Sequence, residues 1–121
     1  MNDETTARIS LRIDLPGGSR LGPGKAALMR AIAAEGSLAA AARRLGLSYP
    51  KAMRLVDELN TAFCEPLIVT RHGGHERGGA NLSPAGERIL ALYGEVIDAA
   101  GRAAARPLDE IAALASAGKS A

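Results

Sequence analysis

The sequence predicts a mainly α-helical protein that carries one small β hairpin. Aromatic residues make up only 2% of the 121 residues, and the hydrophobic 47% is dominated by alanine and aliphatic side chains, a composition that favours helices. Apolar residues recur at helical spacing in successive segments, and one short β-branched run precedes a glycine-rich stretch. Because a chain of this length supports one hydrophobic core, we expect a single domain over residues 1–121.

Charge and cysteine content narrow the class of protein. A net charge of +2 and a pI near 9.0 are a mild basic bias, which does not by itself indicate nucleic-acid binding. The single cysteine excludes an intramolecular disulfide and suits a reducing compartment. No apolar run approaches the roughly 20 residues of a membrane span, and the polar N-terminal residues lack the apolar segment of a signal peptide. We therefore expect a cytoplasmic protein with no membrane partner.

A strand and a first helix are expected at the N-terminal side. The segment "RISLRID", Arg8–Asp14, alternates polar and apolar residues as a half-buried strand does, and "LPGGSRLGPG" then breaks it. Apolar spacing in "KAALMRAIAAE" predicts a helix over residues 25–35, which Gly36 ends.

Two further helices follow across a short turn. Ser37 is placed to cap a second helix that ends at Gly46, and Ser48 is placed to cap a third, with Pro50 tolerated in its first turn. The third helix should bury the apolar positions that recur at spacings of four and three. These positions are Ala52, Val56 and Leu59.

The period of the pattern then changes to that of a hairpin. "LIVTR", residues 67–71, reads as a strand, and "ANL", residues 80–82, can return antiparallel to it across the glycine-rich loop. Ser83 and Pro84 are an N-cap and first-turn pair that opens a long helix over residues 83–106, and residues 107–121 form a short helix and tail.

This order of elements is typical of a winged helix-turn-helix, over residues 8–82, with the hairpin as the wing. The turn "GLS" sets the second and third helices at a steep angle, so the third helix projects its N-terminal residues toward a DNA major groove. Arg43 and Arg44 add positive charge in a stretch without acids. The candidate DNA-binding residues are therefore Arg43, Arg44, Ser48, Tyr49, Lys51, Arg54, and in the wing Arg71, His72, His75 and Arg77. For the third helix the alternative is a solvated face, which the complete pattern disfavours. For the wing the alternative, left open, is that its charges are simply solvated.

Two segments of the sequence also resemble a known family. "GSLAAAARRLGLSYPKAMRLVDELN" and "LIVTRHGGHERGGANLSPAGERIL" are similar to the N-terminal DNA-binding domain of ModE-type molybdate-responsive regulators, which are related to LysR-type regulators. The resemblance covers roughly Ile9 to Arg106 and implies a winged-helix fold, a homodimer and a palindromic operator. Regulators of this type carry C-terminal oxyanion-binding modules, and the sequence ends near Lys119 without room for one. We therefore expect neither molybdate binding nor any cofactor within this chain.

The long helix carries two apolar stripes, of which one can close the core and the other would need a partner. We therefore expect a two-fold homodimer through this helix, assisted by the segment from Leu108 to Leu114. The candidate interface residues are Ile89, Leu90, Tyr93, Val96, Ile97 and Ala100.

Other chemistries find little support. The only Gly-Lys pair, in "GPGKA", lacks the first glycine and the hydroxyl of a phosphate-binding loop. A metal site through His72, His75 and Cys64 lacks a recognised ligand spacing, and Cys64 is expected to be a buried, inert thiol. Since the best-placed serines are helix caps, we expect no enzyme. The functions left open are a sequence-specific transcriptional regulator and a winged helix used for protein contact.

Overall fold

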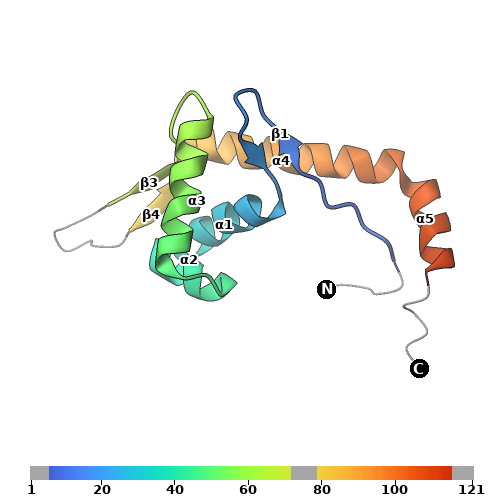
Figure 1. Cartoon of the computed structure of the whole chain (residues 1–121), viewed down its shortest axis with the longest axis horizontal. Coiled ribbons are helices and arrows are strands. Elements are labelled where there is room, and N and C mark those ends of the chain that lie inside the picture. Colours follow the sequence, from blue (N-terminus) through green and yellow to red (C-terminus); the bar gives the residue numbers. More distant parts are fainter. Residues whose placement is uncertain (1–5, 72–78, 116–121) are drawn as a thin grey trace.

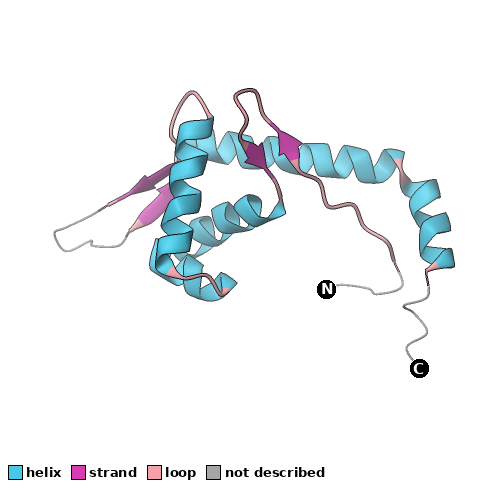
Figure 2. Cartoon of the chain, in the orientation of Figure 1, coloured by secondary structure: helices cyan, strands magenta, loops and turns pink. Residues whose placement is uncertain are grey.

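A computed structural model describes residues 6–71 and 79–115 of the chain (Figure 1). Helices dominate, and two small antiparallel hairpins accompany them (Figure 2). The elements are β1 (Ile13–Asp14), β2 (Arg20–Leu21), α1 (Pro23–Glu35), α2 (Leu38–Leu45), α3 (Tyr49–Ala62), β3 (Ile68–Thr70), β4 (Ala80–Leu82), α4 (Pro84–Ala103) and α5 (Ala105–Leu114). The predicted mainly helical fold with a wing is confirmed. No helix in the described ranges combines the length and hydrophobicity needed to cross a membrane.

Capping residues define the helix-turn-helix as expected. Gly36 and Gly46 end α1 and α2 with φ of 74° and 70°, left-handed values that favour glycine. The hydroxyl oxygens of Ser37 and Ser48 accept hydrogen bonds from backbone N–H groups three residues on, at 3.0 and 3.2 Å. The turn from Gly46 to Ser48 is therefore held at both ends by satisfied backbone groups.

One aliphatic cluster forms the core between the first three helices, the wing and α4. The side chains of Leu28, Met29, Ile32, Leu59 and Leu67 are the largest that are fully buried. The expected inward face of α3, Ala52, Val56 and Leu59, is at most 2% exposed. Burial of this face leaves the opposite side of α3 at the surface.

The base of the wing is joined tightly to α4. β3 pairs with β4 in antiparallel register, Val69 opposite Asn81. The Leu67 carbonyl oxygen accepts a hydrogen bond from the Ser83 N–H at 2.9 Å, and the same carbonyl lies against Gly86, where a Cβ atom would collide with it. The start of α4 therefore needs glycine at this position in order to approach the wing.

The N-terminal segment differs from the expected strand. Only Ile13 and Asp14 pair with another strand, and their partner is β2, which was not predicted. The expected alternation does hold, since Ile9, Leu11 and Ile13 are half-buried between exposed neighbours. The segment stays close to the core because the Leu11 carbonyl accepts a 2.7 Å hydrogen bond from the Tyr93 hydroxyl.

Two other expectations were wrong in detail. The long helix ends at Ala103 rather than at residue 106, and α5 starts at Ala105 and continues through Pro107. Proline fits there because the N–H groups of a first helical turn have no partner within the helix. Cys64 is exposed rather than buried, since α3 stops at Ala62 and the thiol falls in the following loop.

Candidate nucleic-acid interface

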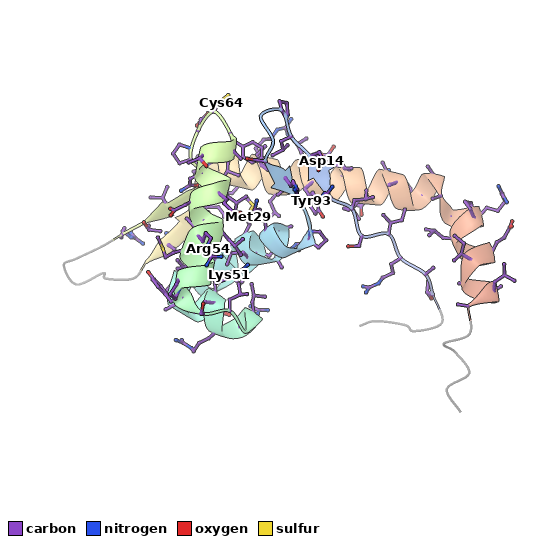
Figure 3. The ribbon with its side chains drawn as sticks, viewed as in Figure 1. Asp14, Met29, Lys51, Arg54, Cys64 and Tyr93 are labelled. Carbon is purple, nitrogen blue, oxygen red and sulfur yellow. The ribbon has the colours of Figure 1, made fainter. Side chains whose placement is uncertain are left out.

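The N-terminal half of α3 presents a polar and basic surface. Ser48, Tyr49, Lys51 and Arg54 are all exposed, as the sequence predicts, and Tyr49 exposes 47% of its surface. Lys51 and Arg54 lie on the lower half of α3 in Figure 3. Neither side chain forms an ion pair with any residue in the described ranges. Their donors therefore face solvent and are available to an external ligand.

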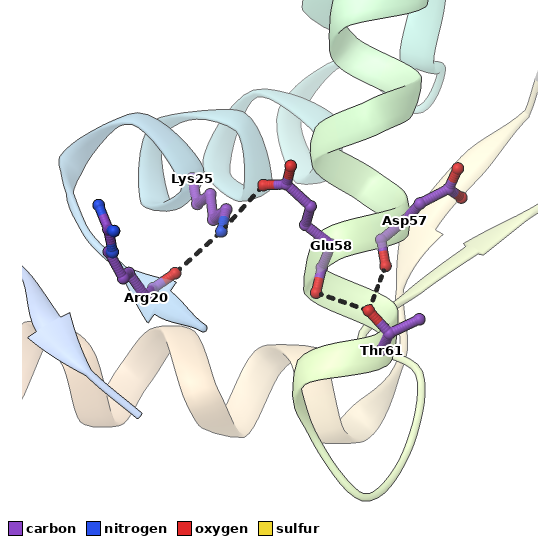
Figure 4. A network of polar contacts seen from close by, with 5 residues as sticks. All are labelled: Arg20, Lys25, Asp57, Glu58 and Thr61. Atoms are coloured by element: carbon purple, nitrogen blue, oxygen red, sulfur yellow. Dashed lines mark hydrogen bonds and ion pairs between the residues drawn. The ribbon is translucent and has the colours of Figure 1, made fainter. Parts of the chain in front are cut away.

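The C-terminal half of α3 has a different electrostatic character (Figure 4). Glu58 is turned toward α1, where its Oε1 lies 3.2 Å from the Nζ of Lys25, which also donates to the Arg20 carbonyl at 3.0 Å. Thr61 donates its hydroxyl to the Asp57 carbonyl at 2.9 Å. The carboxylate of Glu58 is thus matched by a lysine, and positive charge prevails toward the start of α3.

The two arginines that end α2 are placed differently. Arg44 Nη1 lies 2.9 Å from Glu35 Oε2, so its charge is compensated by the end of α1. Arg43 is exposed and forms no ion pair with a described residue. Of the two, Arg43 is therefore the better candidate for an external anion.

Arg71 stands at the base of the wing. It is exposed, and its backbone N–H donates to the Gly79 carbonyl at 2.8 Å. A Cβ atom at Gly79 would stand 3.1 Å from the Nε atom of Arg71, so this glycine lets the guanidinium lie close to the returning chain. The predicted contacts of His72, His75 and Arg77 lie outside the described residues.

Asn60 connects α3 to the wing, and sequence reasoning missed it. Its Oδ1 accepts hydrogen bonds from the Leu67 and Ile68 N–H groups, both at 2.9 Å, and its Nδ2 donates to the Ile68 carbonyl at 3.0 Å. The three bonds fix the position of α3 relative to β3. Only the polar character of one residue near the inward face of a helix could have pointed to this role.

The candidate dimer residues on α4 fall into two groups. Ile89, Leu90 and Ile97 are half-buried against the chain's own core, and Ala100 is also half-buried. Tyr93 is only 3% exposed, and its hydroxyl donates a hydrogen bond to the Leu11 carbonyl. Because almost none of its surface is available to a second copy, its prediction as an interface residue was wrong. Val96 remains 43% exposed, and Leu92, which was not predicted, is 36% exposed.

Metal-ligating groups do not gather in the part of the chain that the structure describes. No three His, Cys, Asp or Glu residues within residues 6–71 and 79–115 lie close enough to hold an ion. Ser37 and Ser83 cap α2 and α4, as expected.

Comparison with known proteins identifies relatives of this arrangement. The chain is 43% identical over 79 residues to the molybdenum-pterin-binding protein MopB of Rhodobacter capsulatus, a match that covers 65% of this chain and 29% of that protein. It is 40% identical over 87 residues to the molybdenum transport protein ModE of Azotobacter vinelandii, a match that covers 72% of this chain and 32% of that protein. It is 34% identical over 71 residues to the DNA-binding transcriptional dual regulator ModE of Escherichia coli (strain K12), a match that covers 59% of this chain and 27% of that protein. The matched part is thus about a third of these relatives' length.

Solved structures agree with the sequence relatives. The CbnR_DBD–DNA complex superposes with a TM-score of 0.53 at 28% identity, over 69% of this chain and 91% of that chain. CbnR itself, a LysR family transcriptional regulator, gives a TM-score of 0.52 at 28% identity, over 69% of this chain and 27% of that chain. The resemblance expected from the sequence is therefore confirmed. Since the sequence model of the lysR-family bacterial regulatory helix-turn-helix proteins matches residues 25–87, just over half of its length, the chain belongs to that family.

Proposed function

We propose that this chain binds double-stranded DNA sequence-specifically, as a homodimer, and regulates transcription. The observation that carries the proposal is the face of α3 on which Ser48, Tyr49, Lys51 and Arg54 are exposed, directly after a capped turn. In helix-turn-helix proteins the N-terminal residues of the second helix contact base edges in the major groove. DNA binding also agrees with the cytoplasmic location that we expect.

The cations divide into two roles. Lys51 and Arg54 project from α3, where they can donate to guanine O6 and N7, the usual acceptors for lysine and arginine in the major groove. Arg43 and Arg71 lie outside α3 and are suited to backbone phosphates, and the remaining predicted wing residues His72, His75 and Arg77 join them in the proposal. Phosphate contacts position the protein but carry no base sequence.

The dimer is proposed to form through α4. Leu92 and Val96 are large aliphatic side chains, four residues apart on one helix face, that the chain's own core leaves exposed. Pairing this face between two copies would bury it, and a two-fold axis would match a palindromic operator with half-sites about 34 Å apart or a multiple of that distance. The other stripe of α4 closes the core of each copy.

Selection of bound duplexes from a random pool tests the proposal. We expect enrichment of a palindromic motif, and the Arg54→Ala variant should then bind that motif about 1–3 kcal/mol more weakly. Arg102→Ala, which removes the same charge from an exposed position near the end of α4, is the matched control. Failure to enrich any motif, or equal losses for the two variants, would favour a winged helix used for protein contact.

We further propose that these 121 residues neither bind molybdate nor catalyse a reaction. A selective oxyanion site needs convergent buried donors, because a doubly charged ion left partly unsatisfied in the interior is costly. The described ranges contain no buried polar or charged residue. Operator binding should therefore be insensitive to micromolar molybdate at fixed ionic strength. A saturable molybdate site, measured by titration calorimetry and not displaced by sulfate, would overturn this part of the proposal.

A further inference from the structure

A groove of about 530 Å³ runs beside α3, between that helix, the α2–α3 turn, the start of α1 and the β1–β2 pair. Its apolar lining is formed by half-buried side chains. These are Ala27, Leu45, Leu47 and Leu55. Four cationic residues stand around them, namely Arg12, Arg20, Lys25 and Lys51, and none of the described residues that line the groove is a carboxylate.

Part of this positive charge has no acidic counterpart among the residues that the structure describes. Arg12 Nε lies 3.0 Å from Asp14 Oδ1, and Lys25 is paired with Glu58. Arg20 and Lys51 form no ion pair in the described ranges. The start of α1, which lines the groove, has neither a side-chain cap nor an acidic residue in its first turn, so its partial positive charge adds to the same region. The groove therefore fits an apolar helix that carries negative charge.

The last helix of the chain has the complementary chemistry. Ile111 and Leu114 of α5 are 61% and 86% exposed, the highest values among large hydrophobic residues in the described ranges. With Leu108 they recur every three residues and so form one stripe along the helix. Arg106 Nη1 lies 2.6 Å from Glu110 Oε2, so one of the two acidic residues of α5 already has a partner on the same helix. With Asp109 and Glu110 against the single Arg106, α5 is still net negative, and the partial negative charge of its C-terminal end adds to this.

Within one chain the two surfaces are far apart. α5 lies at the end of α4 remote from α3, and it bends away from the helical core (Figure 1). No residue of α5 is buried. Ile111 and Leu114 are therefore left uncovered by the described part of their own chain, whereas Leu108 is half-buried and lines a second hollow with Ile9 and Ile97.

We propose that α5 of a second copy docks in this groove, with Ile111 and Leu114 on the groove leucines and Glu110, the neighbour of Leu114 one turn earlier, toward Arg20 and Lys51. Reciprocal docking obeys a two-fold axis, because each copy supplies one helix and one groove. The contact uses the helix-in-groove mode, in which an amphipathic helix lays its apolar face into an apolar groove. It is separate from the α4 contact of the proposed dimer and uses none of the same side chains.

Docking in this position would also act on the DNA-binding face. Lys51 lines the groove and belongs to the exposed N-terminal half of α3. The docked helix of one copy would thus touch the recognition helix of the other, which couples self-association to the orientation of α3.

Self-association of the full chain, measured by sedimentation, is the first test. Ile111→Lys should weaken association by about tenfold or more, because it removes one buried aliphatic side chain and brings a cation to a basic rim. Ala113→Lys places the same charge on the opposite side of α5 and should change association by less than about twofold. On the groove side, Arg20→Glu should weaken association and Arg30→Glu, an exposed arginine of α1 that does not line the groove, should not. Equal effects within either pair would overturn the proposal.

Direct mapping of the contact separates this docking from other modes of association. A synthetic peptide of residues 104–115 is titrated into the full chain carrying Ile111→Lys, whose grooves should be vacant, and leucine methyl signals are followed by NMR. We expect saturable shifts at Leu45, Leu47 and Leu55, and none with a peptide that carries Ile111→Lys. Shifts confined to Leu92 on α4, or no saturable shift at all, would refute docking of α5 in the groove. Selection of DNA sites is measured independently of this contact. If docking of α5 is refuted, the proposed DNA binding is therefore unaffected, and if no DNA motif is enriched, docking of α5 is still tested by the peptide titration.

Discussion

Replacing Asn60 by alanine should uncouple α3 from the wing. The substitution removes two hydrogen bonds that Oδ1 accepts from the Leu67 and Ile68 N–H groups and one that Nδ2 donates to the Ile68 carbonyl. Each such bond contributes about 1 kcal/mol net, and the two N–H groups would lose their acceptor in a region where Leu67 and Ile68 are buried. We therefore expect a loss of about 3 kcal/mol in the free energy of unfolding, a large part of the stability of a small domain.

Two further variants show which part of the side chain matters. Asn60→Asp keeps the two accepted bonds but loses the donor and places a carboxylate oxygen near the Ile68 carbonyl, so it should cost about 1–2 kcal/mol. Thr61→Ala is the neighbouring control, because Thr61 is exposed and, among the described residues, its hydroxyl donates only to carbonyl groups of its own helix. Its effect should stay within about 0.5 kcal/mol.

Urea unfolding followed by circular dichroism measures these differences. The slope with denaturant should stay constant across the variants, so that shifts of the midpoint report stability alone. A cost for Asn60→Ala below about 1 kcal/mol, or no larger than that of Thr61→Ala, would refute the idea that these bonds hold the wing to α3.

Three other predictions test the packing of α4, the dimer and the wing. Gly86→Ala should destabilise the fold by at least about 2 kcal/mol, because the new Cβ would meet the Leu67 carbonyl and backbone must shift. Gly94→Ala, on the same helix with open space around it, should stabilise by about 0.5–1 kcal/mol, and similar unfolding midpoints for the two would contradict this account. Leu92→Glu should shift the proposed dimer toward monomer in sedimentation, whereas an unchanged dimer would place the interface elsewhere. Arg71→Ala should lower DNA affinity for all sequences and reduce the slope of log affinity against log salt by about 0.9, and an unchanged slope would exclude a phosphate contact.

The features that sequence reasoning predicted well depend on neighbours in the chain. Ser37, Ser48 and Ser83 cap helices because a hydroxyl reaches an N–H three residues on, and such a bond leaves a recognisable spacing in the sequence. The buried and exposed faces of α3 follow from helical periodicity for the same reason. Most of the fold and the α3 surface could therefore be derived before any coordinates.

The features that were missed depend on contacts between distant residues. Asn60 bonds backbone groups seven and eight positions away across a loop, and the Tyr93 hydroxyl bonds a carbonyl 82 positions earlier. No local pattern specifies such partners. The exposure of Cys64 was missed for another reason, since it depended on where α3 ends, and helix ends are poorly defined by periodicity.

The double role of the Leu67 carbonyl, which binds the Ser83 N–H and lies against Gly86, has a mechanical consequence. The Ser83 hydroxyl also donates to the Pro66 carbonyl at 2.8 Å, so two successive carbonyl groups before β3 hold the first turn of α4. Rotation of the wing about α4 would break these hydrogen bonds or create a collision. In the proposed dimer each winged helix would then be held rigidly on its α4. Inserting one base pair between two half-sites turns them by about 34° relative to each other. A rigidly held winged helix cannot follow that rotation of its half-site. The DNA would therefore have to twist or bend, at a free-energy cost that depends on the sequence of the spacer.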